Sequence, residues 1–318
     1  MSKTKYNSID LMKFILAIIV VDTHTGLFAN CTNGVILGLQ AVSALLIAPL
    51  FYIASGYLLE KKIDTHHNGA RVIVKHLVSM AKIYVKWSII YLPLAVAKYV
   101  KDGANFGLAL KVYLKAFFLY GEHFNSWILW YVLGAVYALL FVYIMYRLKA
   151  PEEAILAAGF IIGVILSVFL ERYDPTFARV LRAFFFIPLG LFIAKTDIDF
   201  PIGFPVFLVG FVGEYISLNM GRLYSPIGTL FVILASFGLF VMISSIQLKN
   251  SPIYLLLRTL STTIYFVHLW IMSIYSFVRY RELAVYGPGC FLVTFTISLM
   301  LGFALYWWRY KRVRLETK

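Results

Sequence analysis

Apolar segments long enough to cross a bilayer recur along this chain, and short charged stretches separate them. A membrane-spanning helix needs about 20 predominantly apolar residues. Of the 318 residues, 61% are hydrophobic and only 14% are charged, whereas soluble domains average about 45–50% apolar and about 25% charged residues. The pattern excludes an ordinary soluble enzyme and a disordered chain. It also excludes a porin-like barrel, whose strands alternate apolar and polar residues.

We therefore expect an all-α polytopic bundle of about ten transmembrane helices. Residues 1–318 are expected to form one integral membrane domain with no fused soluble domain. The predicted spans are 9–30, 35–59, 79–99, 126–146, 154–170, 179–194, 202–219, 226–246, 257–278 and 289–308. Residues 106–120 are predicted to form a helix at the membrane interface, because Lys111 and Lys115 share one of its faces.

Lysine and arginine outnumber aspartate and glutamate by 29 to 15, which gives a formal net charge of +14. If the N-terminus is placed in the cytoplasm, most of these cations fall in or beside cytoplasmic loops, as the positive-inside rule requires. The sequence thus predicts a multi-pass membrane protein, with both termini cytoplasmic and basic loops against lipid headgroups. Nucleic acid is not an expected partner, because no basic stretch interleaved with aromatic residues lies outside a predicted span.

Three polar side chains, Lys13, Asp22 and His24, interrupt the first predicted span. Charge at the centre of a span costs about 2.5–3.5 kcal/mol on insertion scales, so such residues are functional candidates. At 100° per residue, Lys13 and His24 lie about 20° apart around a helix and about 16 Å apart along it. They therefore share one face, whereas Asp22 lies on nearly the opposite face.

A cation and an imidazole on one face can bind an anionic group and move a proton, because imidazole titrates near neutral pH. Two plainer interpretations stand beside this one. Lys13 can extend its ammonium group to the lipid headgroups, and His24 can hydrogen-bond a carbonyl group at the end of the helix.

The segment Ile9–Ile15, with ten residues between Lys13 and His24, resembles the first helix of the acyltransferase-3 family. These bacterial and eukaryotic integral membrane acyltransferases mostly O-acylate glycans of the cell envelope, and the resemblance implies a multi-pass protein of a plasma membrane, most simply a bacterial one. Three further segments are similar to family motifs in the same order along the chain, namely Pro49–Leu59 with its Ser-Gly pair, Trp127–Tyr131, and Leu260–His268 with its Ser…Ile-Tyr-x-x-His pattern.

The resemblance implies that His24 is the catalytic histidine and Lys13 its basic partner. The family more often has arginine at the second position, and the difference matters because lysine is a point charge whereas arginine can bind an anion bidentately. The donor implied is a cytoplasmic acyl-CoA, most simply acetyl-CoA, and the acceptor is an envelope or lipid-linked glycan. No resident cofactor or metal is implied.

Cations near the third span are candidates for binding the anionic donor. The predicted donor-binding residues are Arg71, Lys75 and Lys82, and Lys61, Lys62 and Lys86 would complete a positive cytoplasmic mouth. The positive-inside rule alone also explains any one of these cations, because basic residues keep cytoplasmic loops on the cytoplasmic side of the membrane. Relatives also tend to carry a proline at the start of this helix, whereas this chain has none before Pro93.

Four residues are predicted to contact substrate: Ser55, Trp127, Tyr265 and His268. The Ser-Gly pair at Ser55 also suits close helix packing, and Trp127 also suits an interfacial aromatic belt. His268 follows Tyr265 by one helical turn, so it can orient the substrate or His24, or can form only a structural hydrogen bond to a neighbouring helix.

The other polar residues are expected to be less informative. Three histidines, His66, His67 and His76, are interpreted as solvated loop residues. Glu214 lies inside a predicted span and needs a partner or a wet cavity. Cys31 and Cys290 belong to no metal-binding motif. Free thiols are favoured for both, and a disulfide between them is left open because both are predicted at the outer ends of spans.

The sequence thus favours a membrane O-acyltransferase that moves an acyl group from acyl-CoA to a hydroxyl of an envelope polysaccharide. The main alternative is a solute permease, such as the amino-acid uptake half of membrane serine racemases linked to vancomycin resistance. A lipid-carrier flippase or a non-catalytic assembly partner is a third possibility. The acceptor sugar, the acyl chain and the oligomeric state are left open.

Overall fold

The structure, a computed structural model, describes residues 6–66, 68–122, 128–196, 198–221 and 225–316. Within these ranges the chain is helical and contains no strand. The helices are α1 (Asn7–Thr25), α2 (Gly34–Ile63), α3 (Gly69–Lys101), α4 (Phe106–Lys115), α5 (Leu129–Arg147), α6 (Glu152–Phe160), α7 (Ser167–Leu170), α8 (Pro175–Leu181), α9 (Ala183–Lys195), α10 (Phe200–Asn219), α11 (Pro226–Ser245), α12 (Ile253–Tyr280) and α13 (Pro288–Glu316). Two π-helical segments, Ala116–Tyr120 and Ile161–Leu166, continue α4 and join α6 to α7.

Nine helical segments in the described residues are long and apolar enough to cross a membrane. They coincide with the second to the tenth predicted spans, which confirms the expected all-α polytopic bundle. The first predicted span corresponds to α1, which carries Asp10, Lys13 and Asp22 and is not among the nine. The predicted interfacial segment is also helical, and none of the residues of α4 is buried.

Two of the predicted boundaries are wrong. The first span was expected to reach residue 30, but α1 ends at Thr25 because Gly26 adopts a left-handed conformation with φ of 73° and its N–H bonds the Asp22 carbonyl. The third helix begins at Gly69, ten residues before the predicted span, and Asn68 caps it by accepting a hydrogen bond from the Arg71 N–H. Arg71 and Lys75 are therefore helical residues.

The chain divides into two compact units. Unit 1 contains residues 1–47 and 242–318, and unit 2 contains residues 48–241. The division passes through α2 and near the end of α11.

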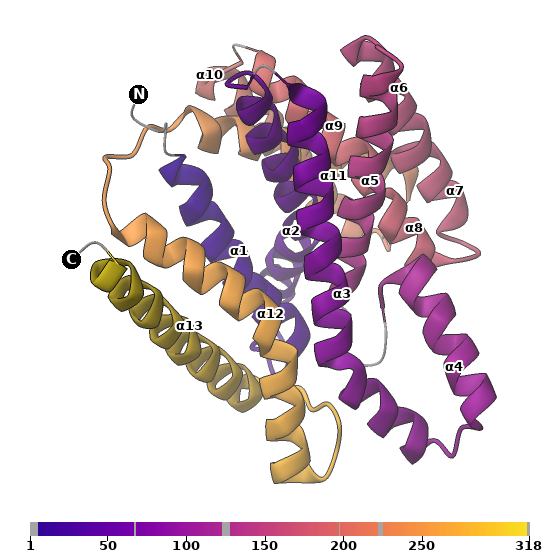
Figure 1. The fold of residues 1–318 in the computed structure, drawn as a ribbon. Coiled ribbons are helices and arrows are strands. Elements are labelled where there is room, and N and C mark those ends of the chain that lie inside the picture. The colour runs from indigo at the N-terminus through magenta and orange to yellow at the C-terminus, as the bar shows by residue number, and fades with distance from the viewer. Residues whose placement is uncertain (1–5, 67, 123–127, 197, 222–224, 317–318) are drawn as a thin grey trace. The chain divides into compact units, whose positions relative to one another are not determined.

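In unit 1, α1 packs along α12, and α12 packs along α13 (Figure 1). Asp10 contacts Arg258, and His24 contacts His268 further along both helices, so α1 and α12 run parallel. Gly302 of α13 faces Leu260, so α13 packs closely against the first half of α12. Apolar side chains from all three helices form the core, including Ala17, Val21, Leu260, Ile264 and Phe291.

The relative directions of α1, α12 and α13 show which of their ends lie on the same side of unit 1. Gly289 of α13 lies near Tyr275 and Gly302 lies near Leu260, which makes α13 antiparallel to α12. The start of α1 and the end of α13 therefore lie on one side of unit 1. The contacts from Asp10 to His24 cover about 21 Å of α1, so α1 lies at the same depth as α12, a candidate span.

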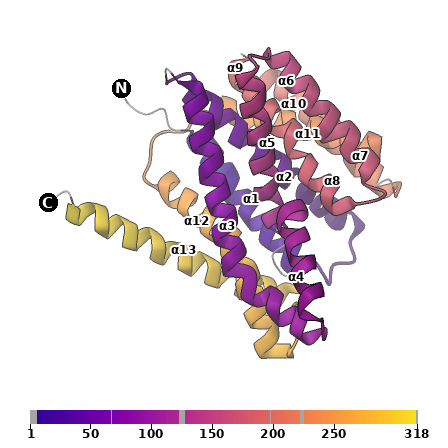
Figure 2. The same ribbon diagram turned by 45° about the vertical axis from the view of Figure 1, so that its right-hand side comes forward.

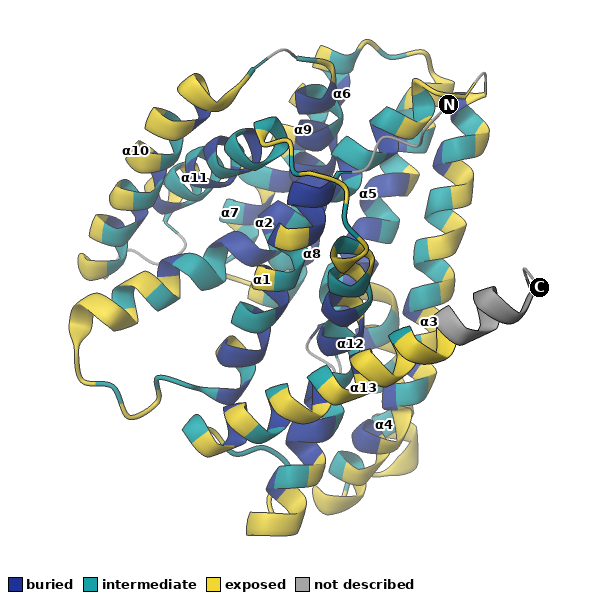
Figure 3. Cartoon of the chain, turned by 90° about the vertical axis from the view of Figure 1, so that its left-hand side faces the viewer, coloured by how far each residue is buried: buried dark blue, intermediate teal, exposed yellow. Residues whose placement is uncertain are grey.

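In unit 2, α9 packs against α5 and α6 (Figure 2). Most of α9 is buried, whereas α13 of unit 1 exposes much of its surface (Figure 3). Gly56 of α2 meets the Ile187 carbonyl of α9, and Gly190 of α9 meets the Ile53 carbonyl of α2. A Cβ on either glycine would overlap that carbonyl oxygen. The predicted packing role of the Ser-Gly pair in α2 is thus confirmed for Gly56.

Candidate functional site

Two histidines from distant parts of the sequence lie against one another in unit 1. The rings of His24 in α1 and His268 in α12 are stacked, with centroids 5.3 Å apart and planes inclined by 29°. His268 is fully buried and His24 is partly exposed. The parallel packing of α1 and α12 brings these side chains together, although 244 positions separate them in the sequence.

The tautomer of His268 follows from its hydrogen bond. Its Nδ1 lies 3.0 Å from the carbonyl oxygen of Ile264, one turn earlier in α12. Because a carbonyl oxygen only accepts, Nδ1 donates and Nε2 of the neutral ring carries the lone pair. No hydrogen-bond partner for this buried Nε2 occurs among the described residues. The structural bond expected for His268 exists, but it is made within α12 rather than to a neighbouring helix.

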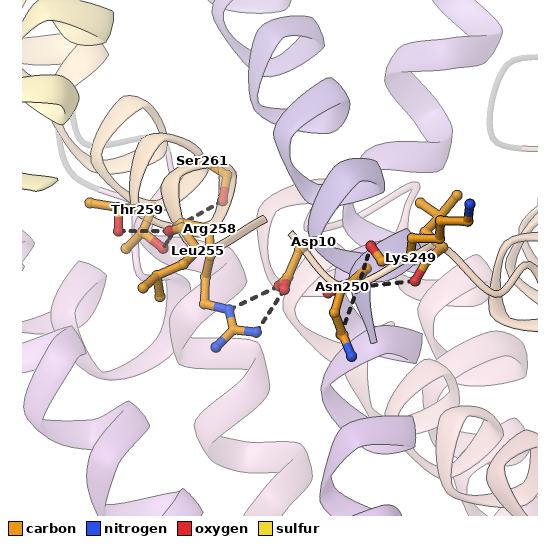
Figure 4. A network of polar contacts seen from close by, with 10 residues as sticks. Asp10, Lys249, Asn250, Leu255, Arg258, Thr259 and Ser261 are labelled. Atoms are coloured by element: carbon orange, nitrogen blue, oxygen red, sulfur yellow. Dashed lines mark hydrogen bonds and ion pairs between the residues drawn. The ribbon is translucent and has the colours of Figure 1, made fainter. Parts of the chain in front are cut away.

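Lys13 lies in the same unbroken helix as His24 and is partly buried. Since α1 is continuous between the two residues, they keep the predicted separation of about 16 Å along one face. One turn before Lys13, Asp10 accepts two hydrogen bonds from Arg258 of α12, at 3.0 Å and 2.6 Å (Figure 4). This ion pair joins α1 to α12 at the end opposite to the histidines.

The end of α1 that carries His24 is held by several contacts within unit 1. Asp22 accepts hydrogen bonds from the Leu27 N–H at 2.9 Å and from Gln40 Nε2 of α2 at 2.8 Å. The Thr25 carbonyl accepts a bond from the Gly287 N–H at 2.7 Å. Asp22 thus orders the turn after α1, which agrees with its predicted position away from the face of His24.

The other predicted substrate contacts are not all beside His24. Tyr265 lies in α12, and its partly buried ring packs edge-on against Phe266 with centroids 5.0 Å apart. Ser55 belongs to unit 2, where its hydroxyl lies 3.0 Å from Nε2 of His76. Trp127 lies outside the described residues.

The predicted donor-binding cations form a stripe on α3 in unit 2. They are Arg71, Lys75 and Lys82. Lys86, from the predicted positive mouth, extends the stripe, and all four side chains are exposed. At 100° per residue they fall within about 60° of one another around the helix, over a length of about 22 Å. Three exposed apolar residues, Val78, Val85 and Ile89, share this part of the surface. The stripe therefore combines positive charge with apolar area, which suits an amphipathic anion.

The interpretation of His76 as a loop residue is wrong. His76 lies in the second turn of α3, because the helix begins ten residues before the predicted span. Hydropathy misses the true start of α3 at Gly69 because Arg71, Lys75 and His76 are polar, and a segment that contains them resembles a solvated loop. The Asn68 cap followed by apolar residues at positions 70, 73, 74 and 77 was the available helix signal.

Glu214 is fully buried in α10 of unit 2. One of its carboxylate oxygens, Oε2, has no hydrogen-bond partner among the described residues. Arg182, which pairs with Glu171 at 2.9 Å, is close enough to act on it electrostatically. Neither Cys31 nor Cys290 forms a disulfide. In the described part of the chain, no three His, Cys, Asp or Glu residues come together as metal ligands.

The chain matches no protein-family model, no curated protein and no solved structure. The resemblance to the acyltransferase-3 family therefore stays a prediction from four short segments.

Proposed function

We propose that this protein is a membrane O-acyltransferase of the acyltransferase-3 type. It would move an acyl group, most simply acetyl, from cytoplasmic acyl-CoA to a hydroxyl of a cell-envelope glycan. The observation that carries the proposal is the stacked pair of His24 and His268 inside a bundle of membrane helices. Imidazoles within apolar surroundings are costly and are functional candidates for that reason.

His24 is the base in this proposal. It accepts the proton of the acceptor hydroxyl while the hydroxyl oxygen attacks the acyl carbonyl carbon. In direct transfer the bond from that carbon to the CoA sulfur breaks, and the departing thiolate takes the proton from the His24 imidazolium. The products are the glycan ester and free CoA, so atoms and charge balance.

His268 is a positioning residue. Its Nδ1–H bond to the Ile264 carbonyl fixes the ring and its tautomer, and the ring supports one face of His24. A base must keep the correct orientation towards the proton that it accepts. The Asp10–Arg258 ion pair contributes in the same way, because it fixes the register of α1 against α12.

The exposed stripe of Arg71, Lys75, Lys82 and Lys86 is suited to bind an anionic donor. Like charges three or four residues apart on one helix face repel each other by a few tenths of a kcal/mol per pair, roughly. Phosphate groups relieve that repulsion and form charge-assisted hydrogen bonds with the same side chains. Acyl-CoA offers such phosphates together with an apolar arm.

The direct test uses the full chain in lipid nanodiscs with radiolabelled acetyl-CoA and an envelope glycan fraction. We expect label in the glycan and release of CoA with the wild type, and loss of at least about 100-fold in rate for His24→Ala, the range of general-base contributions. His66→Ala is the matched control, because His66 is exposed and lies outside every helix.

Label transfer that is unchanged in His24→Ala would refute the catalytic assignment. Uptake of a free solute into vesicles without CoA release would instead favour the permease. His268→Gln should lower the turnover rate more than it raises the KM for acetyl-CoA, because it removes orientation of the base rather than donor binding.

A further inference from the structure

Ser55 and His76 form a second polar pair, in unit 2. The hydroxyl of Ser55 in α2 lies 3.0 Å from Nε2 of His76 in α3. Both residues are partly exposed. A serine hydroxyl within hydrogen-bond reach of an imidazole is the arrangement that activates a serine as a nucleophile.

Other hydroxyl residues in this chain behave differently. Ser43 bonds the Leu39 carbonyl at 2.8 Å, and Ser167 bonds the Gly163 carbonyl at 2.8 Å. These are contacts to the preceding turn of the same helix, which is the usual arrangement for serine in a helix. Ser55 instead pairs with a basic side chain of the next helix, so local helix geometry does not explain its contact.

The pair lies close to the tip of a helical hairpin. Ser55 precedes the end of α2 at Ile63 by about 12 Å, and His76 follows the start of α3 at Gly69 by about 10 Å. Charged residues occupy the stretch between the pair and the tip, including Glu60, Lys61, Lys62, Asp64, Arg71 and Lys75. The apolar sections of both helices extend the other way. This places the pair near the boundary between the apolar and polar parts of the hairpin, where a soluble donor can reach it.

The cationic stripe runs past this pair. Arg71 and Lys75 precede His76, and Lys82 follows it, on a face about 100–140° around α3 from the imidazole. The stripe and the Ser55–His76 pair therefore lie on different faces of α3, and a donor contacts both only if a long flexible arm between its phosphates and its acyl group passes around the helix. An anionic thioester suits both features, because its phosphates can bind the cationic stripe and its acyl carbon can react with Ser55.

We propose that Ser55, with His76 as its base, takes the acyl group from the donor thioester as a covalent acyl-serine. This inference rests on the proposed acyltransferase function and assigns its donor half-reaction. Nε2 of His76 accepts the Ser55 proton while Oγ attacks the thioester carbonyl carbon. The carbon–sulfur bond breaks, and the CoA thiolate takes the proton from the imidazolium. An acceptor hydroxyl, or water when no acceptor is present, later cleaves the serine ester.

The test follows the donor half-reaction alone. The full chain in nanodiscs is mixed with radiolabelled acetyl-CoA without glycan, quenched in acid and examined by peptide mass spectrometry. We expect an acetyl group on the peptide with Ser55 in the wild type and also in His24→Ala, because the first step does not require His24. Ser55→Ala should lose the adduct, and Ser43→Ala, the matched control on the same helix, should keep it.

Two further variants separate chemistry from folding. Ser55→Cys should form an acyl-thioester adduct that neutral hydroxylamine cleaves, whereas the acyl-serine resists that treatment. His76→Gln should lower the rate of adduct formation at least about 100-fold, the range of general-base contributions. A purely structural role for the pair would give no acyl group at position 55, either in the wild type or in Ser55→Cys.

Glycan acylation without any adduct on Ser55, or an adduct on His24 instead, would overturn this inference and leave the proposed function intact. An absence of both CoA release and glycan acylation would refute the two together. An adduct that persists in Ser55→Ala on another residue would also overturn the assignment.

Discussion

The Asp10–Arg258 ion pair predicts an unequal cost for losing its two members. The Asp10 side chain is only 7% exposed, whereas the Arg258 side chain is 57% exposed. Removing the partner of a buried charge costs about 3–5 kcal/mol, while exposed pairs contribute only about 0–1 kcal/mol. Because only the carboxylate is buried here, we expect about 2–3 kcal/mol of destabilisation for Arg258→Ala. For Asp10→Asn we expect about 1 kcal/mol, since water solvates the remaining guanidinium.

Thermal unfolding in nanodiscs, followed by circular dichroism, measures this difference. A loss of 1 kcal/mol lowers Tm by about 2–4 °C in chains of 150–250 residues and by less in longer ones. We therefore expect a decrease of roughly 2 °C for Asp10→Asn and roughly 4 °C for Arg258→Ala. Arg279→Ala is the matched control, because Arg279 lies at the exposed end of the same helix and has no carboxylate partner among the described residues.

The double variant Asp10→Asn with Arg258→Gln makes the test sharper. It removes the buried charge together with its partner, so it should be more stable than Arg258→Ala alone. Equal losses for the two single variants, or a larger loss for Asp10→Asn, would refute the argument from burial. Unchanged stability in both single variants would remove the support that this pair gives to the register of α1 and to the position of His24.

Three further predictions concern unit 2. Gly56→Ala should destabilise the protein by about 1–3 kcal/mol because its Cβ overlaps α9, whereas Gly34→Ala, with open space around it, should not; thermal unfolding compares them. Burial raises the pKa of Glu122, so the wild type loses stability as pH rises above about 4.3, the usual glutamate pKa. Glu122→Gln does not titrate, so it should gain stability relative to the wild type as pH rises from that value, in unfolding assays. Lys195→Met should cost about 2–3 kcal/mol, because it leaves the buried Glu60 carboxylate, 3.1 Å from the ammonium, without that partner; Lys62→Met, on an exposed side chain, is the comparison.

The helices could be predicted because membrane helices have an unusually simple signal. Every backbone polar group in a bilayer must bond within its own segment, so a long apolar run implies a helix. That argument fails where a helix continues beyond the apolar run. Three polar residues, Arg71, Lys75 and His76, interrupt the first ten residues of α3, and the Asn68 cap with the apolar residues that follow it marks this section as helical. The wrong interpretation of His76 follows from this one missed boundary.

Helical periodicity predicts only the part of the site that lies along a single helix. The spacing of Lys13 and His24 depends on helical periodicity, so it could be worked out from the sequence and holds in a continuous α1. Contacts between helices are of another kind. The pairs His24–His268 and Ser55–His76 depend on which helices pack together and in which register, and one sequence does not contain that information.

Contacts within unit 1 explain why the two acidic residues occur in α1, but they do not explain the histidine pair. Asp10 binds Arg258, and Asp22 bonds Gln40 and the Leu27 N–H, so the cost of placing these acids in a membrane helix is offset by contacts that hold unit 1 together. The histidine pair is different, because the buried Nε2 of His268 has no hydrogen-bond partner in the described residues. A buried acceptor without a partner costs about 1–3 kcal/mol, and an apolar residue at position 268 would avoid that cost. Structure alone thus accounts for both acids but not for the imidazole beside His24, which is why the functional proposal rests on that pair.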